Sequence, residues 1–334
     1  MSFKHKVSVI ITTRNGLIFL RSCLPTITKQ IYKNIEIVIG DNNSTDGIEK
    51  YLAKYYPRIK FYKNYKDYGF AKANNIAAKA ATGFFLFFIN NDTELFPDTI
   101  TNLVKEYEDN TILTAYQIPA RNKRLQGRVG GGMDIFGYPY HDANTDETKL
   151  FYADGAAIFI KRKDFIKIGL FDEKLYMFQE DIDFSWRAQM MGYKIKPVTL
   201  AKLYHYYGGT APINLSEKSQ YVSSTFRRYQ NERNVIRNIL KNYSLPFVLM
   251  TLPLLTILHL IEIFFFAIQG KFSVANCYLR AYFWNAIQLK NTLQTRKIIQ
   301  RKRLISDGEI IKRLYITYSK VNMVFRLKKV PTFT

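Results

Sequence analysis

Cysteine is nearly absent from this chain, and so are the structures that depend on it. Only Cys23 and Cys277 occur among 334 residues, which excludes a disulfide framework and a cysteine-rich zinc cluster. The chain therefore fits a reducing compartment. A long apolar run near the N-terminus is also lacking. Residues 7–11 are too few for the apolar core of a signal peptide, so we expect no export.

Acidic residues are scarce as well, with 27 Asp and Glu against 49 Lys and Arg, which gives a formal net charge of +22. The excess is uneven: residues 214–334 hold 20 basic against 5 acidic residues, and residues 1–213 hold 29 against 22. A basic C-terminal region serves nucleic acid, anionic lipid or solubility. We therefore predict two domains, residues 1–213 and residues 214–334.

The first 110 residues alternate apolar strands with helical stretches, and the 47% hydrophobic content supports a full core. This alternation predicts right-handed βαβ units and a mostly parallel, Rossmann-like α/β sheet flanked by helices. The expected strands are residues 7–12, 35–40, 59–62, 84–89, 111–118, 151–160 and 195–204, and the expected helices are 16–30, 45–55, 71–81, 97–108, 181–191 and 216–241.

Two of these strands end in acids and amides. The fourth runs directly into Asn90, Asn91 and Asp92, and the second runs into Asp41. Open α/β sheets bind ligands at the carboxyl ends of their strands. One such acid could be a turn residue, but two strand ends of this kind in a basic chain indicate a site for a divalent cation and a nucleotide.

Glu180 and Asp181 stand at the start of a predicted helix. Adjacent acids there could simply interact with the helix dipole. The aromatic segment 171–178 upstream could form a pocket wall, however, and a carboxylate aimed into a cleft makes a usable general base. Trp186 and Arg187 follow within two turns, where they could supply a stacking face and a positive charge to an acceptor or sugar pocket.

His205 follows the last predicted strand of the first domain. A lone histidine is more often a structural residue than a ligand. It could nevertheless join Asp92 on a cation, because Mg²⁺ and Mn²⁺ keep waters and need only one or two protein ligands beside substrate phosphates. An imidazole ligand favours Mn²⁺. Residues 12–16 and Asp67 are open to two interpretations, as turns or as nucleotide contacts.

These segments, in this order, resemble the inverting glycosyltransferases of family 2, which have the GT-A fold. They are similar in particular to the rhamnosyltransferase-like enzymes of bacterial surface polysaccharide synthesis, which carry Asn-Asn-Asp in place of Asp-x-Asp. The resemblance covers about residues 5–245. It is carried by residues 7–16, 41–47, 67–70, 90–92, 180–181, His205 and a Tyr-x-x-x-Arg-Asn segment at 229–234.

The resemblance implies roles for the polar strand ends. Asp41 would hydrogen-bond the pyrimidine base of a nucleotide. Thr13, Asn15 and Asn91 would line the nucleotide pocket, and Asp67 would lie near the base or ribose.

The resemblance also implies the catalytic groups. Asp92 would bind Mg²⁺ or Mn²⁺ bridging the donor diphosphate, with His205 as a further metal or phosphate contact. Asp181 would deprotonate the acceptor hydroxyl, and Glu180 would orient the acceptor or its neighbour. Asn90 replaces an acid of the related motif and leaves the metal fewer negative charges, which fits a weak or partly dispensable metal.

The implied reaction moves a sugar, with rhamnose as one candidate, from a dTDP- or UDP-sugar to a lipid-linked glycan acceptor. Direct displacement by a hydroxyl needs one base and no carboxylate nucleophile, so inversion follows. A cation stabilises the charge that develops on the leaving diphosphate.

Residues 245–269 carry no Lys or Arg and a single acid, Glu262. The stretch is long enough to span a bilayer, but Pro253 and His259 interrupt it and a single crossing would break the positive-inside rule. We expect a hairpin or in-plane helix on the cytoplasmic face of the cell membrane, with residues 272–289 as a second interfacial segment and basic residues on anionic headgroups. A buried helical pair of a soluble domain is the alternative.

Three other function classes are alternatives. A nucleotidyltransferase would carry a glycine- and lysine-rich phosphate loop, which residues 12–16 lack. A nucleic-acid-binding protein would carry basic and aromatic residues on its folded half, whereas most of the charge here lies beside apolar helices, so we expect no nucleic acid. A catalytically silent, membrane-bound partner subunit differs from the enzyme only in activity. Homo-oligomerisation is left open.

Overall fold

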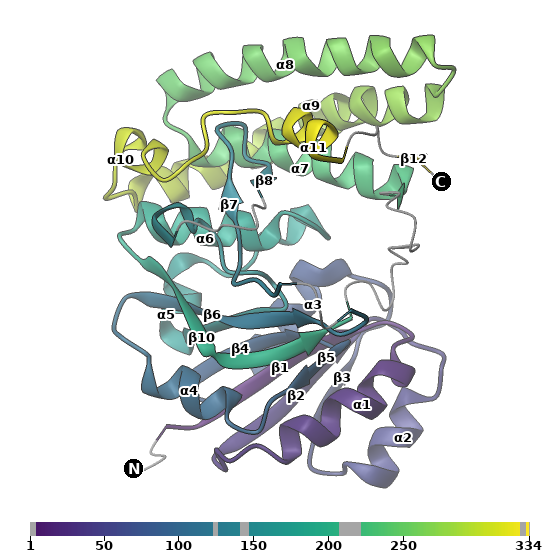
Figure 1. Cartoon of the computed structure of the whole chain (residues 1–334), viewed down its shortest axis with the longest axis vertical. Coiled ribbons are helices and arrows are strands. Elements are labelled where there is room, and N and C mark those ends of the chain that lie inside the picture. Colours follow the sequence, from purple (N-terminus) through teal and green to yellow (C-terminus); the bar gives the residue numbers. More distant parts are fainter. Residues whose placement is uncertain (1–4, 123–125, 141–146, 207–221, 328–331, 334) are drawn as a thin grey trace. The chain divides into compact units, whose positions relative to one another are not determined.

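The computed structural model describes residues 5–122, 126–140, 147–206, 222–327 and 332–333 (Figure 1). The chain forms two compact units. The first comprises residues 1–131, 143–185 and 193–212, and the second comprises residues 132–142, 186–192 and 213–334. The predicted domain division after residue 213 stays a prediction, and each unit is described by itself.

The first unit is built on one eight-stranded sheet in the order β3-β2-β1-β4-β9-β6-β10-β5. Its strands are β1 (Val7–Thr13), β2 (Ile35–Asp41), β3 (Lys60–Lys63), β4 (Phe85–Asn90), β5 (Thr93–Leu95), β6 (Thr111–Pro119), β9 (Ala157–Lys161) and β10 (Lys194–His205). Strands β1 to β4 are mutually parallel where they pair, as are β6 and β10, whereas β9 and β5 pair antiparallel with their neighbours. The expected α/β class with a parallel-dominated sheet is confirmed.

Side chains alternate between the two faces of each strand, and the central strands are apolar on both faces. Helices therefore cover both faces of the sheet. Val7, Val9 and Ile11 face a core shared with apolar residues of α1, α2 and α4. On the other face, Phe88 packs against Phe165 of α5. The helices of this unit are α1 (Leu17–Thr28), α2 (Ile48–Tyr55), α3 (Gly69–Ala80), α4 (Thr99–Lys105), α5 (Arg162–Ile168) and the first residues of α6 (Glu180–Met190), with 3₁₀ turns η1 (Glu147–Lys149) and η2 (Glu173–Leu175).

Two sequence-based expectations for this unit were wrong in detail. The strand expected at 151–160 exists only as β9, because Asp154 and Gly155 turn the chain before it. The helix expected at 97–108 is shorter, as α4 ends at Lys105. Strand β5 and helix α5 were not expected, since three and seven residues give little periodicity to detect.

The second unit is mainly helical. Its elements are α7 (Thr225–Asn242), α8 (Leu245–Ile268), α9 (Phe272–Arg301), α10 (Asp307–Ile311), α11 (Ser319–Leu327), the hairpin β7 (Gly132–Met133) and β8 (Pro139–Tyr140), and the pair β11 (Val222–Ser223) and β12 (Thr332–Phe333). Ser224 caps α7 by accepting a hydrogen bond from the Arg227 backbone N–H. The helix expected at 216–241 begins at Thr225. Residues 216–221 of that prediction lie outside the described part of the chain.

Helix α7 is packed along α9, and α8 lies against both. Buried polar residues of α7 form hydrogen bonds with α9. The Arg237 guanidinium donates to Thr292 at 2.6 Å and to Asn291 at 3.0 Å. The Tyr-x-x-x-Arg-Asn segment belongs to this interior, because Arg233 stacks on Trp284 at 4.5 Å. Within the described residues, α8 is the helix long and apolar enough to cross a membrane, judged by length and composition alone.

Candidate active site

The polar strand ends of the first unit meet at one edge of the sheet. Thr13 pairs in register with Asp41 on β2, and Thr12 pairs with Asn90 on β4. Since β1, β2 and β4 are parallel, their carboxyl ends share that edge. The structure therefore brings together three segments that the sequence had marked separately.

Thr13 and Asn91 are joined at this edge. The Asn91 side-chain amide donates to Thr13 Oγ1 at 2.8 Å, and both residues are buried. Gly16 makes the contact possible, because a Cβ there would lie 2.0 Å from Asn91 Nδ2 and 2.5 Å from Thr13 Oγ1. The first strand–helix turn thus depends on the absence of a side chain at residue 16.

Two loops that follow β1 and β2 brace each other. The Asn15 backbone N–H donates to Ser44 Oγ at 2.8 Å, and Asn15 Oδ1 accepts from the Thr45 N–H at 2.8 Å. Asn15 has a φ of 49°, a left-handed conformation that Asn tolerates better than most residues. Asp41 is fully buried and accepts from the Ser44 N–H at 3.0 Å. These bonds fix the loops before any ligand binds.

Asp67 joins the same region to the segment before α6. It forms an ion pair with Arg14 and accepts a hydrogen bond from the Tyr176 hydroxyl at 2.8 Å. Its other carboxylate oxygen accepts from the Gly69 N–H at 2.8 Å. A nucleotide contact by Arg14 would compete with this ion pair.

Asp92 and His205 lie side by side. Asp92 Oδ1 is 3.3 Å from His205 Nε2, and both side chains are about 6% exposed. Their proximity comes from β5, which starts directly after Asp92 and pairs Thr93 with His205 at the end of β10. The proximity of Asp92 and His205 was expected from the sequence, but the pairing of strands β5 and β10 that produces it was not.

The hydrogen bonds of His205 fix its orientation. His205 Nδ1 lies 2.8 Å from Gln117 Oε1, which can only accept, so Nδ1 carries the proton. Nε2 is then the nitrogen that faces Asp92. Asn90 Nδ2 lies 3.3 Å from the same Nε2. Gln117 was not singled out from the sequence, where it is one polar residue inside an apolar strand.

This pair fits a divalent cation of limited protein coordination. A carboxylate oxygen and an imidazole nitrogen 3.3 Å apart can ligate one ion together, with waters and diphosphate oxygens filling the other positions. A complete protein cage is not offered: no group of three or more His, Cys, Asp or Glu side chains suited to a metal occurs in the described part of the chain. Asn90 contributes an amide where an acid would add charge.

A second acidic group lies at the start of α6. Asp181 Oδ2 accepts from the Gly155 N–H at 3.0 Å, and Oδ1 accepts from the Ile182 N–H at 2.8 Å. Asp154, next to Gly155, forms an ion pair with Arg128 at 2.7 Å. A Cβ at Gly155 would lie 3.6 Å from Asp181 Oδ2, so the backbone of Gly155 is directly beside this carboxylate.

Burial makes this group difficult to ionise. Loss of solvation, followed by the charge of Asp154, raises the pKa of Asp181 to about 6. Loss of solvation and the neighbouring Asp181 raise the pKa of Glu180 well above its usual range. Glu180 Oε2 is buried with no hydrogen-bond partner among the described residues. A carboxylate whose pKa lies close to neutral pH is suited to accept a proton.

The backbone that presents these acids is strained. Tyr176, Phe178 and Gln179 all have φ values between 64° and 69°, which side-chain-bearing residues rarely adopt. The Tyr176 carbonyl accepts from the Ala71 N–H at 3.2 Å, which ties the segment to α3. The aromatic segment 171–178 therefore turns sharply to place Glu180 and Asp181 at a helix start.

Trp186 and Arg187 belong to the second unit. Trp186 is fully buried, and its ring packs edge-on against Tyr243 at 4.6 Å; Arg187 is 5% exposed. Their expected part in an acceptor or sugar pocket stays a prediction. Asp154 and Arg128 were missed from the sequence, although an Asp-Gly pair in an apolar stretch was a usable signal.

The sheet with polar carboxyl ends defines a Rossmann-like α/β protein, a class whose ligands bind at that edge. Residues 8–169 match the family described as Glycosyl transferase family 2. The match covers 162 of the 334 residues, and over this part the chain is assigned to glycosyltransferase family 2 with the GT-A fold. Both the family and the fold expected from the sequence are thereby confirmed, whereas rhamnosyl specificity is not.

Relatives match over limited stretches. The O-antigen biosynthesis protein RfbC of Myxococcus xanthus is 23% identical over 65% of this chain and 18% of its own length. The GalNAc(5)-diNAcBac-PP-undecaprenol beta-1,3-glucosyltransferase of Campylobacter jejuni is 32% identical over 30% of this chain and 34% of its own length. The chain thus spans about a fifth to a third of these relatives.

Solved structures share the fold at low identity. GalNAc-T7, crystallised with UDP, GalNAc and Mn²⁺, has a TM-score of 0.56 and 19% identity over 71% of this chain and 48% of its own. The mannosyltransferase PcManGT of Pyrobaculum calidifontis, in complex with GDP-Man and Mn²⁺, has a TM-score of 0.53 and 17% identity over 90% of this chain and 86% of its own.

Proposed function

We propose that this protein is an inverting, metal-assisted glycosyltransferase that moves a sugar from a nucleotide diphosphate donor to a lipid-linked glycan acceptor in surface polysaccharide synthesis. The observation that carries the proposal is that the first unit contains both a candidate metal-binding group and a candidate general base. Asp92 and His205 form a cation-compatible pair at the sheet edge, and Asp181 forms a near-neutral carboxyl at the start of α6.

The chemistry assigned to these residues is simple. Asp41, Thr13 and Asn15 would hold the nucleotide in the braced loops, with Asn91 beside Thr13 and Asp67 near the ribose. Asp92 and His205 would hold Mg²⁺ or Mn²⁺, which when bound stabilises negative charge on the departing diphosphate. Asp181 would take the proton of the acceptor hydroxyl as that oxygen attacks the anomeric carbon, and Glu180 would orient the acceptor.

Inversion follows from the use of a single base. The hydroxyl oxygen forms the new glycosidic bond while the bond to the donor diphosphate breaks, and the proton passes to the Asp181 carboxylate. No carboxylate becomes bonded to the sugar, so the configuration at the anomeric carbon is reversed. Relatives named for O-antigen biosynthesis and for an undecaprenol-linked substrate support a lipid-linked acceptor, at the cytoplasmic face of a membrane.

The test is nucleotide release from a panel of UDP-, dTDP- and GDP-sugars, with Mn²⁺, Mg²⁺ or a chelator. We expect release from one donor with a divalent cation, and loss of that release in Asp92→Ala. The matched control is Asp98→Ala, at an exposed aspartate directly before α4 whose side chain makes no cap hydrogen bond. If no donor is turned over even with isolated lipid-linked glycan, the silent-subunit interpretation replaces this proposal.

A further inference from the structure

Helix α8 has the reverse polarity of a helix that faces water. Its exposed side chains are all apolar, whereas polar residues would be expected there in water. All four polar or charged side chains of the helix, Thr251, Thr256, His259 and Glu262, are buried or partly buried. Six of these exposed residues, each at least half exposed, are here called the outer face: Leu249, Leu254, Ile257, Ile261, Phe264 and Ile268.

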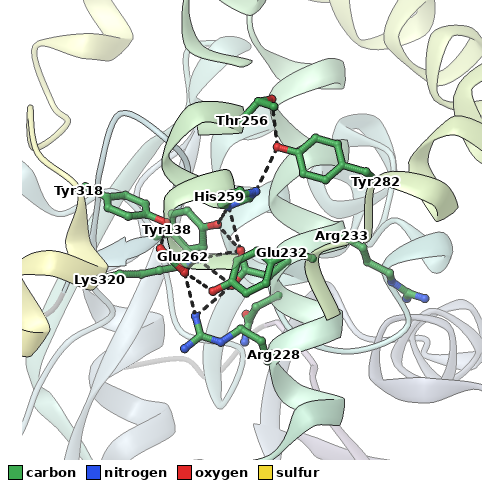
Figure 2. Close-up of polar contacts among 12 residues, drawn as sticks. Tyr138, Arg228, Glu232, Arg233, Thr256, His259, Glu262, Tyr282, Tyr318 and Lys320 are labelled. Atoms are coloured by element: carbon green, nitrogen blue, oxygen red, sulfur yellow. Dashed lines mark hydrogen bonds and ion pairs between the residues drawn. The ribbon is translucent and has the colours of Figure 1, made fainter. Parts of the chain in front are cut away.

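The inner face is held by an ionic network inside the second unit (Figure 2). Glu232 of α7 is fully buried and lies 3.2 Å from His259 Nε2. Lys320 of α11 bridges the two acids, at 2.8 Å from Glu232 and 3.2 Å from Glu262. Arg228 adds a further ion pair to Glu232 at 3.1 Å.

Neutral hydroxyls complete this network. His259 Nδ1 lies 3.1 Å from the Tyr282 hydroxyl of α9, which in turn donates to Thr256 at 3.0 Å. Tyr138 of the β7–β8 hairpin segment hydrogen-bonds Glu232, and Tyr318 hydrogen-bonds Glu262. Pulling α8 away from α7 and α9 to cross a bilayer alone would expose His259 and Glu262 to hydrocarbon, which is costly.

The segment formed by α8, α9 and the turn between them has an excess of positive charge. Residues 245–303 hold eight Lys and Arg against the single acid Glu262. Lys271 lies in the α8–α9 turn, and Arg280, Lys290, Lys297 and Arg301 are exposed along α9. Anionic headgroups complement such a flank. A protein partner is less suited to the outer face, since protein interfaces carry about one hydrogen bond per 100–200 Å² and these side chains offer none.

We infer that α8 is a monotopic membrane helix: it lies lengthwise in one leaflet of an anionic membrane, with its outer face among the acyl chains. The inner-face network keeps it on α7 and α9. This inference deepens the proposed membrane location and rests on the proposed function in that respect only. Of the two arrangements expected from the sequence, a hairpin and an in-plane helix, it favours the in-plane helix.

The first experiment is flotation of the full chain with phosphatidylcholine vesicles, with and without phosphatidylglycerol. We expect binding that is stronger with phosphatidylglycerol. Leu254→Arg/Ile261→Arg should weaken binding by about tenfold or more, since two apolar side chains would no longer be buried among acyl chains. The matched control is Leu200→Arg, a 65% exposed leucine of the first unit, which should bind as the parent does. Equal binding of the double variant and the parent overturns the inference.

The second experiment measures depth. Leu249→Cys, Ile257→Cys and Phe264→Cys are each labelled with an environment-sensitive fluorophore and quenched by lipids with nitroxides at graded depths; both natural cysteines are buried. An in-plane helix predicts equal depth for the three labels. A label at Ile257 much deeper than those at the two ends indicates a span, and no quenching at any of them indicates another occupant, such as a second copy. Either result overturns the inference.

Membrane binding and sugar transfer can fail separately. Donor turnover by Leu254→Arg/Ile261→Arg in detergent should equal that of the parent if the first unit acts alone on the donor. Loss of vesicle binding with retained donor turnover supports the inference without testing the transferase. If the parent protein binds vesicles but turns over no donor, the membrane role of α8 stands and the proposed function is refuted.

Discussion

The two units each bury a cluster of carboxylates, and they treat it in opposite ways. In the first unit, Glu180 and Asp181 lie together near Asp154, which forms an ion pair with Arg128 at 2.7 Å. In the second unit, Glu232 is surrounded by Lys320, Arg228 and His259.

The consequence is visible in the proton affinities. Burial raises the pKa of Asp181 and Glu180 because little positive charge opposes it. Burial alone would also raise the pKa of Glu232, but Lys320, His259 and Arg228 outweigh it and hold that pKa well below its usual range. An unbalanced acid is available for chemistry, and a balanced one fastens helices together. Both groups of acids are buried, so the neighbouring positive charge and not burial distinguishes the catalytic role from the structural one.

The largest effect should come from removing the unbalanced acid. Asp181→Asn should lower kcat by about 10²–10⁴-fold, the usual contribution of a general base, while leaving Tm nearly unchanged. The measurement pairs sugar transfer with thermal unfolding. Full transfer activity in this variant would refute the assignment of the base.

Removing the balanced acid should act on stability instead. Glu232→Gln leaves Lys320 and Arg228 facing a neutral group, and it should cost about 3–5 kcal/mol of unfolding free energy. Denaturant unfolding measures this. Glu309→Gln, which breaks the exposed pair with Lys312, is the control and should change stability by less than about 0.5 kcal/mol. Equal effects of the two variants would contradict the structural role of Glu232.

A smaller effect should follow from crowding the nucleotide loops. Gly16→Ala puts a methyl group 2.0 Å from Asn91 Nδ2, so the Thr13–Asn91 hydrogen bond must break. Loss of one such bond should weaken donor nucleotide binding about fivefold, as measured by calorimetry. Gly308→Ala, whose Cβ would have 3.8 Å of clearance, should leave binding unchanged.

The smallest effect should be a shift in pH dependence. Asp181 must be ionised to accept a proton, so transfer should fall about tenfold per pH unit below its pKa of about 6. Asp154 and the adjacent Glu180 are the acids that interact with it. Asp154→Asn removes one cause of the raised pKa and should move the acidic limb of the pH–rate profile to lower pH. An unmoved limb would mean that burial alone sets that pKa.

The raised pKa of Asp181 also determines the direction in which the unfolding free energy changes with pH. The pKa of Asp181 is about 6 in the folded state and about 3.9 in an unfolded chain, so the folded protein binds more protons between these values. The contribution of Asp181 to the unfolding free energy therefore falls as pH rises from about 4 to 6. Stability measured over that window should be less pH-dependent in Asp181→Asn.

Much of the first unit was predictable because its signals are local. Apolar runs such as the one ending at Asn90 identify strands, and parallel pairing then gathers Thr13, Asp41 and Asn91 at one edge without further information. What could not be predicted depended on contacts distant in sequence. Asp154 lies beside Asp181 only because the chain turns before β9, and no periodicity announces that turn. The reversed polarity of α8 was hidden for a related reason, since the partners of His259 and Glu262 come from four other segments: α7, α9, α11 and the β7–β8 hairpin.

The three-residue strand β5 bears on the order of folding. It joins Asp92 to His205 across 113 positions of sequence, and contacts of such long range form late because loop closure opposes them. A chain that has folded only its first βα units can bury a core without this pair. The site for the donor diphosphate would therefore be completed in one of the last steps, when β10 has docked and β5 closes the sheet edge, so an unfinished chain could not engage the donor fully.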